Sequence, residues 1–165
     1  MKNYLLILLF FSSFISFACR CENEKNIKDE FEFVDYVVVG KILSIDTINV
    51  IDSNQIQNPI DNRVVQELPR QSIQVAHFKL EINKIYKGVI TKKTIDLYSA
   101  PSDESCGFIF KKGLSYVIYG FSKPVMYFDD TGDYSPPEGE NKIWITRCGR
   151  TRIKKLNELK ILDTI

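Results

Sequence analysis

Histidine is nearly absent from this chain of 165 residues, and neither sign of charge is in excess. The single histidine, His77, leaves the Cys19-x-Cys21 pair without the imidazole ligands of a usual zinc site, so we expect no metal or cofactor of the protein's own. The 22 basic and 21 acidic residues nearly cancel, which argues against a nucleic-acid partner. The ordered ligands of an EF-hand are also missing, so the acidic segment 129–133 is interpreted as a solvated turn.

The first eighteen residues have the three-part layout of a secretory signal. Lys2 is followed by an apolar run and then by small residues at Ser16 and Ala18. The run is shorter than the roughly 20 residues that a membrane-spanning helix needs. We therefore expect cleavage after Ala18, which makes Cys19 the first residue of a single domain, 19–165. The expected location is secreted, extracellular or periplasmic.

A second processing route starts from the same cysteine. Bacterial lipoprotein processing also requires a cysteine directly after the cut, and it acylates the new amino terminus. Lipoprotein signals usually place leucine three residues before that cysteine, whereas this chain has Ser16. The small residue favours ordinary cleavage. A membrane attachment is expected only if Cys19 is acylated.

The four cysteines, Cys19, Cys21, Cys106 and Cys148, all lie after the expected cut. An even number of cysteines in an exported chain predicts two disulfides, and four cysteines allow three connectivities. A Cys19 to Cys21 bond closes a cramped loop, so each of these two is expected to reach across the domain. Such a bond closes a loop of roughly 90 residues or more, and it contributes about 4 to 5 kcal/mol to the free energy of unfolding in the chain-entropy model.

The periodicity of apolar residues is mainly that of strands. The β-branched segment around Val37, Val38 and Val39 predicts a central strand, and alternation from Phe78 predicts a half-buried strand whose period slips near Asn83, where a bulge is expected. The expected strands are 36–43, 78–86, 94–98, 115–121 and 142–148. Helical segments are predicted at 22–32 and 151–162, and long loops or an extended hairpin at 46–74 and 123–141. Five short strands favour a mainly β, Greek-key barrel of the OB type.

Four segments and the leading Cys19-Arg20-Cys21 resemble the N-terminal domain of tissue inhibitors of metalloproteinases, a member of the netrin-like module family. The segments are Asp35-Tyr36-Val37-Val38-Val39-Gly40-Lys41, Phe78-Lys79-Leu80-Glu81-Ile82-Asn83-Lys84-Ile85-Tyr86-Lys87-Gly88, Glu104-Ser105-Cys106-Gly107 and Ile145-Thr146-Arg147-Cys148. Their order and spacing match over nearly the whole mature chain. The resemblance implies an OB-type barrel and the disulfide pairs Cys19–Cys106 and Cys21–Cys148.

The resemblance also implies a function, which is inhibition of a zinc metalloendopeptidase rather than catalysis. In that family the terminal α-amino nitrogen and carbonyl oxygen chelate the zinc of the target protease. Here that terminus is Cys19, and a catalytic zinc keeps an open position for such ligands. The implied inhibitory residues, which chelate the zinc or form the wedge around it, are Cys19, Arg20, Cys21, Ser102, Asp103, Glu104, Ser105 and Cys106. Animal inhibitors carry a small residue where this chain has Arg20.

A binding function without inhibition is the alternative. A netrin-like module, secreted or lipid-anchored, presents its loops to another extracellular protein and needs no free amino terminus. The basic residues Arg147, Arg150, Arg152, Lys154 and Lys155 fit a polyanion-binding stretch or a solvated helix face, and we favour the solvated face.

Overall fold

The computed structural model describes residues 21, 25–51, 72–101, 107–124, 137 and 139–165. The described elements are, in chain order, α2 (Ile27–Phe33), β1 (Tyr36–Ile51), β2 (Ser72–Lys87), β3 (Thr94–Ser99), β4 (Ser115–Gly120), β5 (Lys142–Trp144), β6 (Arg152–Ile153) and α3 (Leu156–Leu162). The protein is mainly β, as predicted, with one helix near each end of the described chain.

The six strands form one mixed sheet in the order β5-β3-β2-β1-β4-β6. All neighbours pair antiparallel except β3 and β5, which are parallel. An isolated bridge joins Phe121, just after β4, to Trp144 in β5, through two main-chain hydrogen bonds of 2.8 and 2.9 Å. This bridge connects the end of β4 to β5, which is the edge strand at the opposite side of the sheet order.

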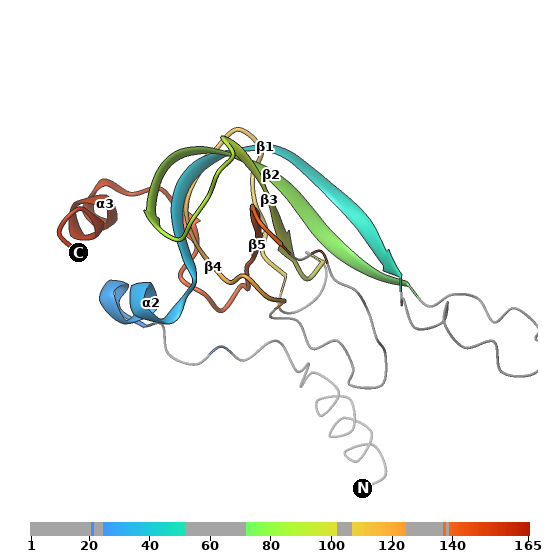
Figure 1. The fold of residues 1–165 in the computed structure, drawn as a ribbon, viewed down its shortest axis with the longest axis horizontal. Coiled ribbons are helices and arrows are strands. Elements are labelled where there is room, and N and C mark those ends of the chain that lie inside the picture. Colours follow the sequence, from blue (N-terminus) through green and yellow to red (C-terminus); the bar gives the residue numbers. More distant parts are fainter. Residues whose placement is uncertain (1–20, 22–24, 52–71, 102–106, 125–136, 138) are drawn as a thin grey trace, which may run out of the picture.

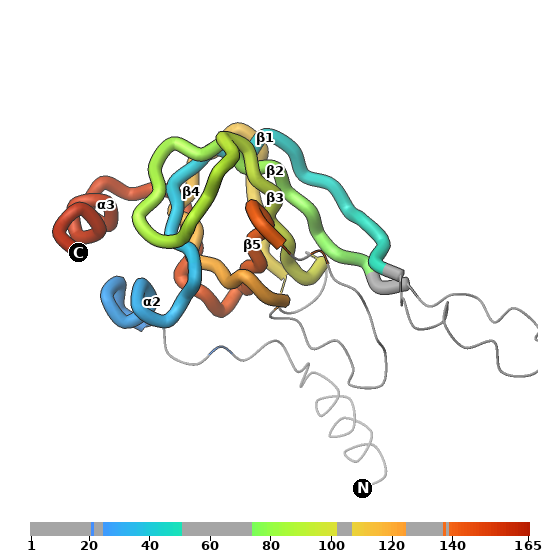
Figure 2. The backbone as a smooth tube through the Cα atoms, viewed as in Figure 1, coloured from blue at the N-terminus to red at the C-terminus, as the bar shows by residue number. Residues whose placement is uncertain are grey.

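The β1–β2 hairpin is the longest element, and it curves over the other strands (Figure 2). Its register shifts at three places, and one shift skips Asn83, because Val39 pairs with Lys84 while Gly40 pairs with Ile82. The predicted bulge at Asn83 is therefore confirmed. A Cβ at Gly40 would lie 2.5 Å from the Glu81 carbonyl, so the strands approach too closely there for a side chain.

Buried residues lie on both faces of β1, which explains its continuous apolar run. Val38 and Ile42 face the largest core cluster, whereas Val37 and Val39 face a second cluster with residues from α2 and α3. The two helices lie together on one side of the sheet, and the far end of the hairpin extends on the other (Figure 1). The helices thus complete the burial of the central strand.

The boundaries of several predicted elements are wrong. The described residues form six strands instead of the five predicted, because the predicted helix at 151–162 begins only at Leu156 and residues 152–153 pair with β4. The last long strand ends at Trp144 instead of at position 148, and the N-terminal helix spans Ile27–Phe33 instead of 22–32. For 46–74 the prediction is a long loop or an extended hairpin, and the described residues 46–51 and 72–74 agree with the hairpin, since they belong to β1 and β2. The predicted loop 123–141 lies largely outside the described residues.

Trp144 is fully buried, but it packs neither in the largest core cluster nor against α3. It joins Val50, Val75 and Tyr98 in a third cluster on the extended hairpin, with its ring 5.4 Å from that of Tyr98. The indole N–H donates to the Pro137 carbonyl at 3.0 Å. This cluster exists because the hairpin is longer than the sequence periodicity indicates.

Candidate functional site

Most of the predicted inhibitory residues lie outside the described part of the chain. These are Cys19, Arg20, Ser102, Asp103, Glu104, Ser105 and Cys106. The expected Cys19–Cys106 disulfide and the signal 1–18 therefore remain predictions. Cys21 is described, as are Pro101 and Gly107, the residues on either side of 102–106, and these show where the chain enters and leaves the undescribed part of the predicted site.

A disulfide joins Cys21 to Cys148, with Cα atoms 5.1 Å apart, so this predicted pair is confirmed. Cys148 lies in an exposed turn after β5, in which its main-chain N–H donates to the Thr146 hydroxyl at 3.3 Å. The bond spans 127 residues of sequence. It attaches the N-terminal segment to the end of the β5 region.

The two residues that flank 102–106, Pro101 and Gly107, lie close together. A Cβ added to Gly107 would lie only 1.9 Å from the Pro101 carbonyl oxygen, so glycine is required for this close approach. The next residue, Phe108, donates its main-chain N–H to the buried Ser99 hydroxyl at 2.9 Å. The residues on both sides of 102–106 thus lie at the end of β3.

The parallel pairing of β3 and β5 brings these two attachment points to one edge of the sheet. Tyr98 is paired with Trp144, and the Ile145 N–H donates to the Tyr98 carbonyl at 2.9 Å. Parallel strands end at the same edge, so Pro101 and the turn that holds Cys148 both follow strands at this edge of the sheet. The structure therefore brings together the described residues that border two parts of the predicted site.

Arg150 makes a second connection to the N-terminal segment, which the sequence analysis missed. Its guanidinium Nη1 donates to the Lys25 carbonyl at 2.9 Å, and its Nε donates to the buried Glu158 carboxylate at 3.0 Å. Its main-chain N–H donates to the buried Glu30 carboxylate at 3.3 Å. The available signal was Glu158 itself, a charged residue four positions before the buried Leu162 on α3.

The favoured solvated face for the basic stretch is therefore wrong at two positions. Arg150 pairs with Glu158, and the Arg152 Nε lies 3.6 Å from the other oxygen of the same carboxylate. The Tyr119 hydroxyl donates to this carboxylate at 2.9 Å. Burial, and then the neighbouring Glu158 charge, raises the pKa of Tyr119, which keeps it a donor at neutral pH.

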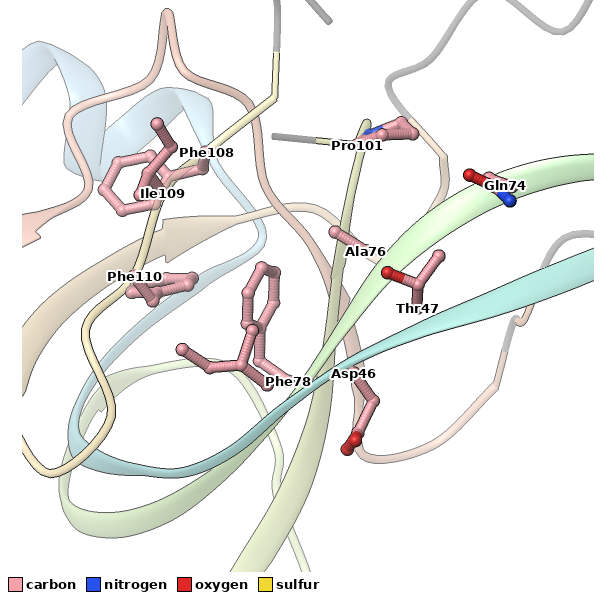
Figure 3. A pocket seen from close by; sticks show the side chains of 10 residues that line it. Asp46, Thr47, Gln74, Ala76, Phe78, Pro101, Phe108, Ile109 and Phe110 are labelled. Atoms are coloured by element: carbon pink, nitrogen blue, oxygen red, sulfur yellow. The ribbon is translucent and has the colours of Figure 1, made fainter. Parts of the chain in front are cut away.

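A cavity of about 470 Å³ lies between the β1–β2 hairpin and residues 108–110 (Figure 3). The aromatic rings of Phe78, Phe108 and Phe110 form one side, and Thr47 and Gln74 contribute polar groups from the hairpin. Pro101, which precedes the 102–106 segment, also lines it. The lining, which also includes the Asp46 carboxylate, suits a side chain or small ligand that carries both apolar and polar groups.

No cluster of three or more metal-ligating side chains is found among the described residues. His77 has its Nε2 atom 2.8 Å from the Asp96 carboxylate and stacks on Tyr98 with ring centroids 5.1 Å apart. Burial raises the pKa of Tyr98 to about 12. Within the described elements, no helix is long and apolar enough to cross a membrane.

No protein-family model matches the chain, and a comparison with curated proteins finds no match.

Proposed function

We propose that the sheet is a Greek-key barrel of the OB type, within a netrin-like domain spanning 19–165. The support is its topology. Three strand pairs, β3 with β5, β1 with β4 and β4 with β6, join strands that are not consecutive in the chain, as in a Greek key. The bridge between Phe121 and Trp144 joins β4 to β5 and so supports closure of a five-stranded barrel, with β6 as an addition.

We further propose that the mature protein is a secreted inhibitor of zinc metalloendopeptidases and not an enzyme. The α-amino nitrogen and carbonyl oxygen of Cys19 chelate the target zinc, Arg20 enters the adjoining substrate pocket, and residues 102–106 form the other side of the wedge. The observation that carries the proposal is the Cys21–Cys148 bond at the edge where the 102–106 segment also attaches. One rigid edge then carries both halves of the wedge.

The proposed chemistry requires a neutral terminal amine. A free α-amino group has a pKa of about 7.7 to 8.0, and a metal ligand binds in its deprotonated form. Arg20 is long and cationic, so the target pocket is deep or acidic. The expected target is therefore a zinc protease that accepts a basic side chain just after the scissile bond.

The test is inhibition of a panel of zinc proteases by the mature protein, 19–165, with its disulfides formed. Addition of one alanine ahead of Cys19 should abolish inhibition, since the chelating nitrogen becomes an amide. Arg20→Thr serves as the matched variant, because it changes the pocket side chain and keeps the free amine. A panel left untouched by the mature protein, or equal inhibition by the extended protein, contradicts the proposal.

A binding module without inhibitory activity is the second candidate, and the cavity favours it. Ile109 lines the cavity and is 64 % exposed, so it offers apolar contact area to another extracellular protein. If this module is lipid-anchored, intact mass of the native protein will show a diacylglycerol-modified Cys19. An unmodified amine at Cys19 excludes the anchored form.

A further inference from the structure

The N-terminal segment is attached to residues 148–150 at three points. The Cys21–Cys148 disulfide is the first, and the hydrogen bond from the Arg150 guanidinium to the Lys25 carbonyl is the second. The third is the bond from the Arg150 main-chain N–H to Glu30 in α2. A single attachment leaves a chain free to pivot, whereas attachments at Cys21 and at Lys25 hold two points that lie four residues apart.

The Arg150 side chain is well placed to set this direction because it is itself held rigidly. It is 13 % exposed, and its Nε donates to a carboxylate of α3 that also accepts the Tyr119 hydroxyl of β4. A guanidinium presents several donors in a fixed plane, so one nitrogen can bind Glu158 while another binds the Lys25 carbonyl. A lysine ammonium is a compact charge and lacks this planar spacing.

We propose that Arg150 is a positioning residue. Its guanidinium binds Glu158 of α3, which also binds Tyr119 of β4, and it holds the Lys25 carbonyl, and so the N-terminal segment at that residue, in a fixed position relative to α3 and β4. This inference deepens the proposed function and rests on it for its biological meaning, because the segment it orients leads to the chelating Cys19. It assigns to α3 a role in presenting the opposite end of the chain.

The first experiment measures the segment directly, without any protease. Backbone order parameters from ¹⁵N relaxation at Lys25 and Asn26 should be about 0.85 in the wild type. In Arg150→Lys the ammonium stays with Glu158, the charged partner, so unfolding stability changes little while the order parameters fall below about 0.6. Unchanged order parameters in Arg150→Lys overturn the proposal.

Thr151→Val is the matched control at the adjacent position. The Thr151 hydroxyl accepts from the Tyr119 N–H and donates to its carbonyl, both at 3.0 Å, so this variant destabilises the same region and keeps the guanidinium. Its denaturation midpoint should fall, with order parameters at Lys25 like those of the wild type. Equal loosening in Thr151→Val means that general destabilisation moves the segment, which also overturns the proposal.

The second experiment separates this inference from the proposed function. Against a protease that the mature protein inhibits, Arg150→Lys should raise the dissociation rate constant on the order of ten-fold, the effect of losing one charge-assisted hydrogen bond. Loosened order parameters in a protein that inhibits no protease uphold the positioning role and reject the inhibitor. An unchanged dissociation rate with a loosened segment rejects the role of Arg150 in presenting Cys19.

Discussion

The double replacement Cys21→Ser and Cys148→Ser removes the disulfide between Cys21 and the turn after β5. It tests how much of the free energy of unfolding depends on this covalent bond. The bond joins residues 127 apart. In the chain-entropy model a loop of that size contributes about 4.9 kcal/mol, so the unfolding equilibrium constant should rise by more than about three orders of magnitude. That is a large share of the roughly 5 to 15 kcal/mol of a typical domain.

The size of the loss also reports on the predicted Cys19–Cys106 bond. If that bond is present, it links residues 19 and 106 in the unfolded chain. The loop that Cys21–Cys148 closes then contains only roughly 45 residues, and the bond contributes about 4.0 kcal/mol to the free energy of unfolding. The same double replacement should therefore cost about 0.9 kcal/mol less in the wild-type background than in a Cys19→Ser, Cys106→Ser background.

Urea denaturation followed by tryptophan fluorescence is the assay. Trp144 is the only tryptophan and is fully buried, so its emission reports on loss of tertiary packing. A loss below about 2 kcal/mol without Cys19 and Cys106 refutes the entropic reasoning. Equal losses in the two backgrounds refute the Cys19–Cys106 bond, and unchanged m-values are the control for comparable unfolded states.

Three further predictions concern the sheet and its charged contacts. Gly120→Ala places a Cβ 2.3 Å from a methyl group of β5 and should cost about 3 kcal/mol in urea denaturation, whereas Gly149→Ala, whose nearest contact is 3.4 Å, should change stability little. Glu158→Gln leaves two guanidinium groups without their carboxylate and should cost about 2 to 3 kcal/mol by the same assay, and a loss under about 0.5 kcal/mol contradicts this account. The main-chain and hydroxyl donors of Ser122, both 2.7 Å from the Asp35 carboxylate, lower the pKa of Asp35 below 3.8. The stabilisation by Asp35 is therefore complete above the pKa that the group has in the unfolded chain, and it is lost as pH falls through its lower pKa in the folded protein. Asp35→Asn should flatten the acid part of a plot of the urea denaturation midpoint against pH.

Short-range patterns were sufficient for the positions of the main strands and one bulge. The run Val37-Val38-Val39 is apolar on both faces, and the structure buries both faces of β1. The slip in alternation at Asn83 is the sequence mark of an extra residue on one strand, and the register skips that residue. Both features depend only on which side of the backbone each residue occupies.

Features that depend on a distant partner could not be predicted. The strand at 152–153 forms because β4 offers an unpaired edge, and nothing in its two residues distinguishes it from a helix start. For residues 46–74 the sequence left a loop and an extended hairpin open. The pairing of 46–51 with 72–77, with Val50 in the same cluster as Trp144, decides for the hairpin. The contacts of Arg150 join Lys25, Glu30 and Glu158, which are far apart in the sequence.

Strand periodicity is a local property and was enough to predict a mainly β protein, and the family resemblance implied the bond between Cys21 and Cys148. The place of that bond depends on the packed sheet. The parallel pairing of β3 and β5 puts the bond at the same edge as Pro101, and the Arg150 guanidinium binds both the buried Glu158 and the Lys25 carbonyl. Register and burial are properties of the packed sheet, since each arises from residues that meet only when the chain has folded.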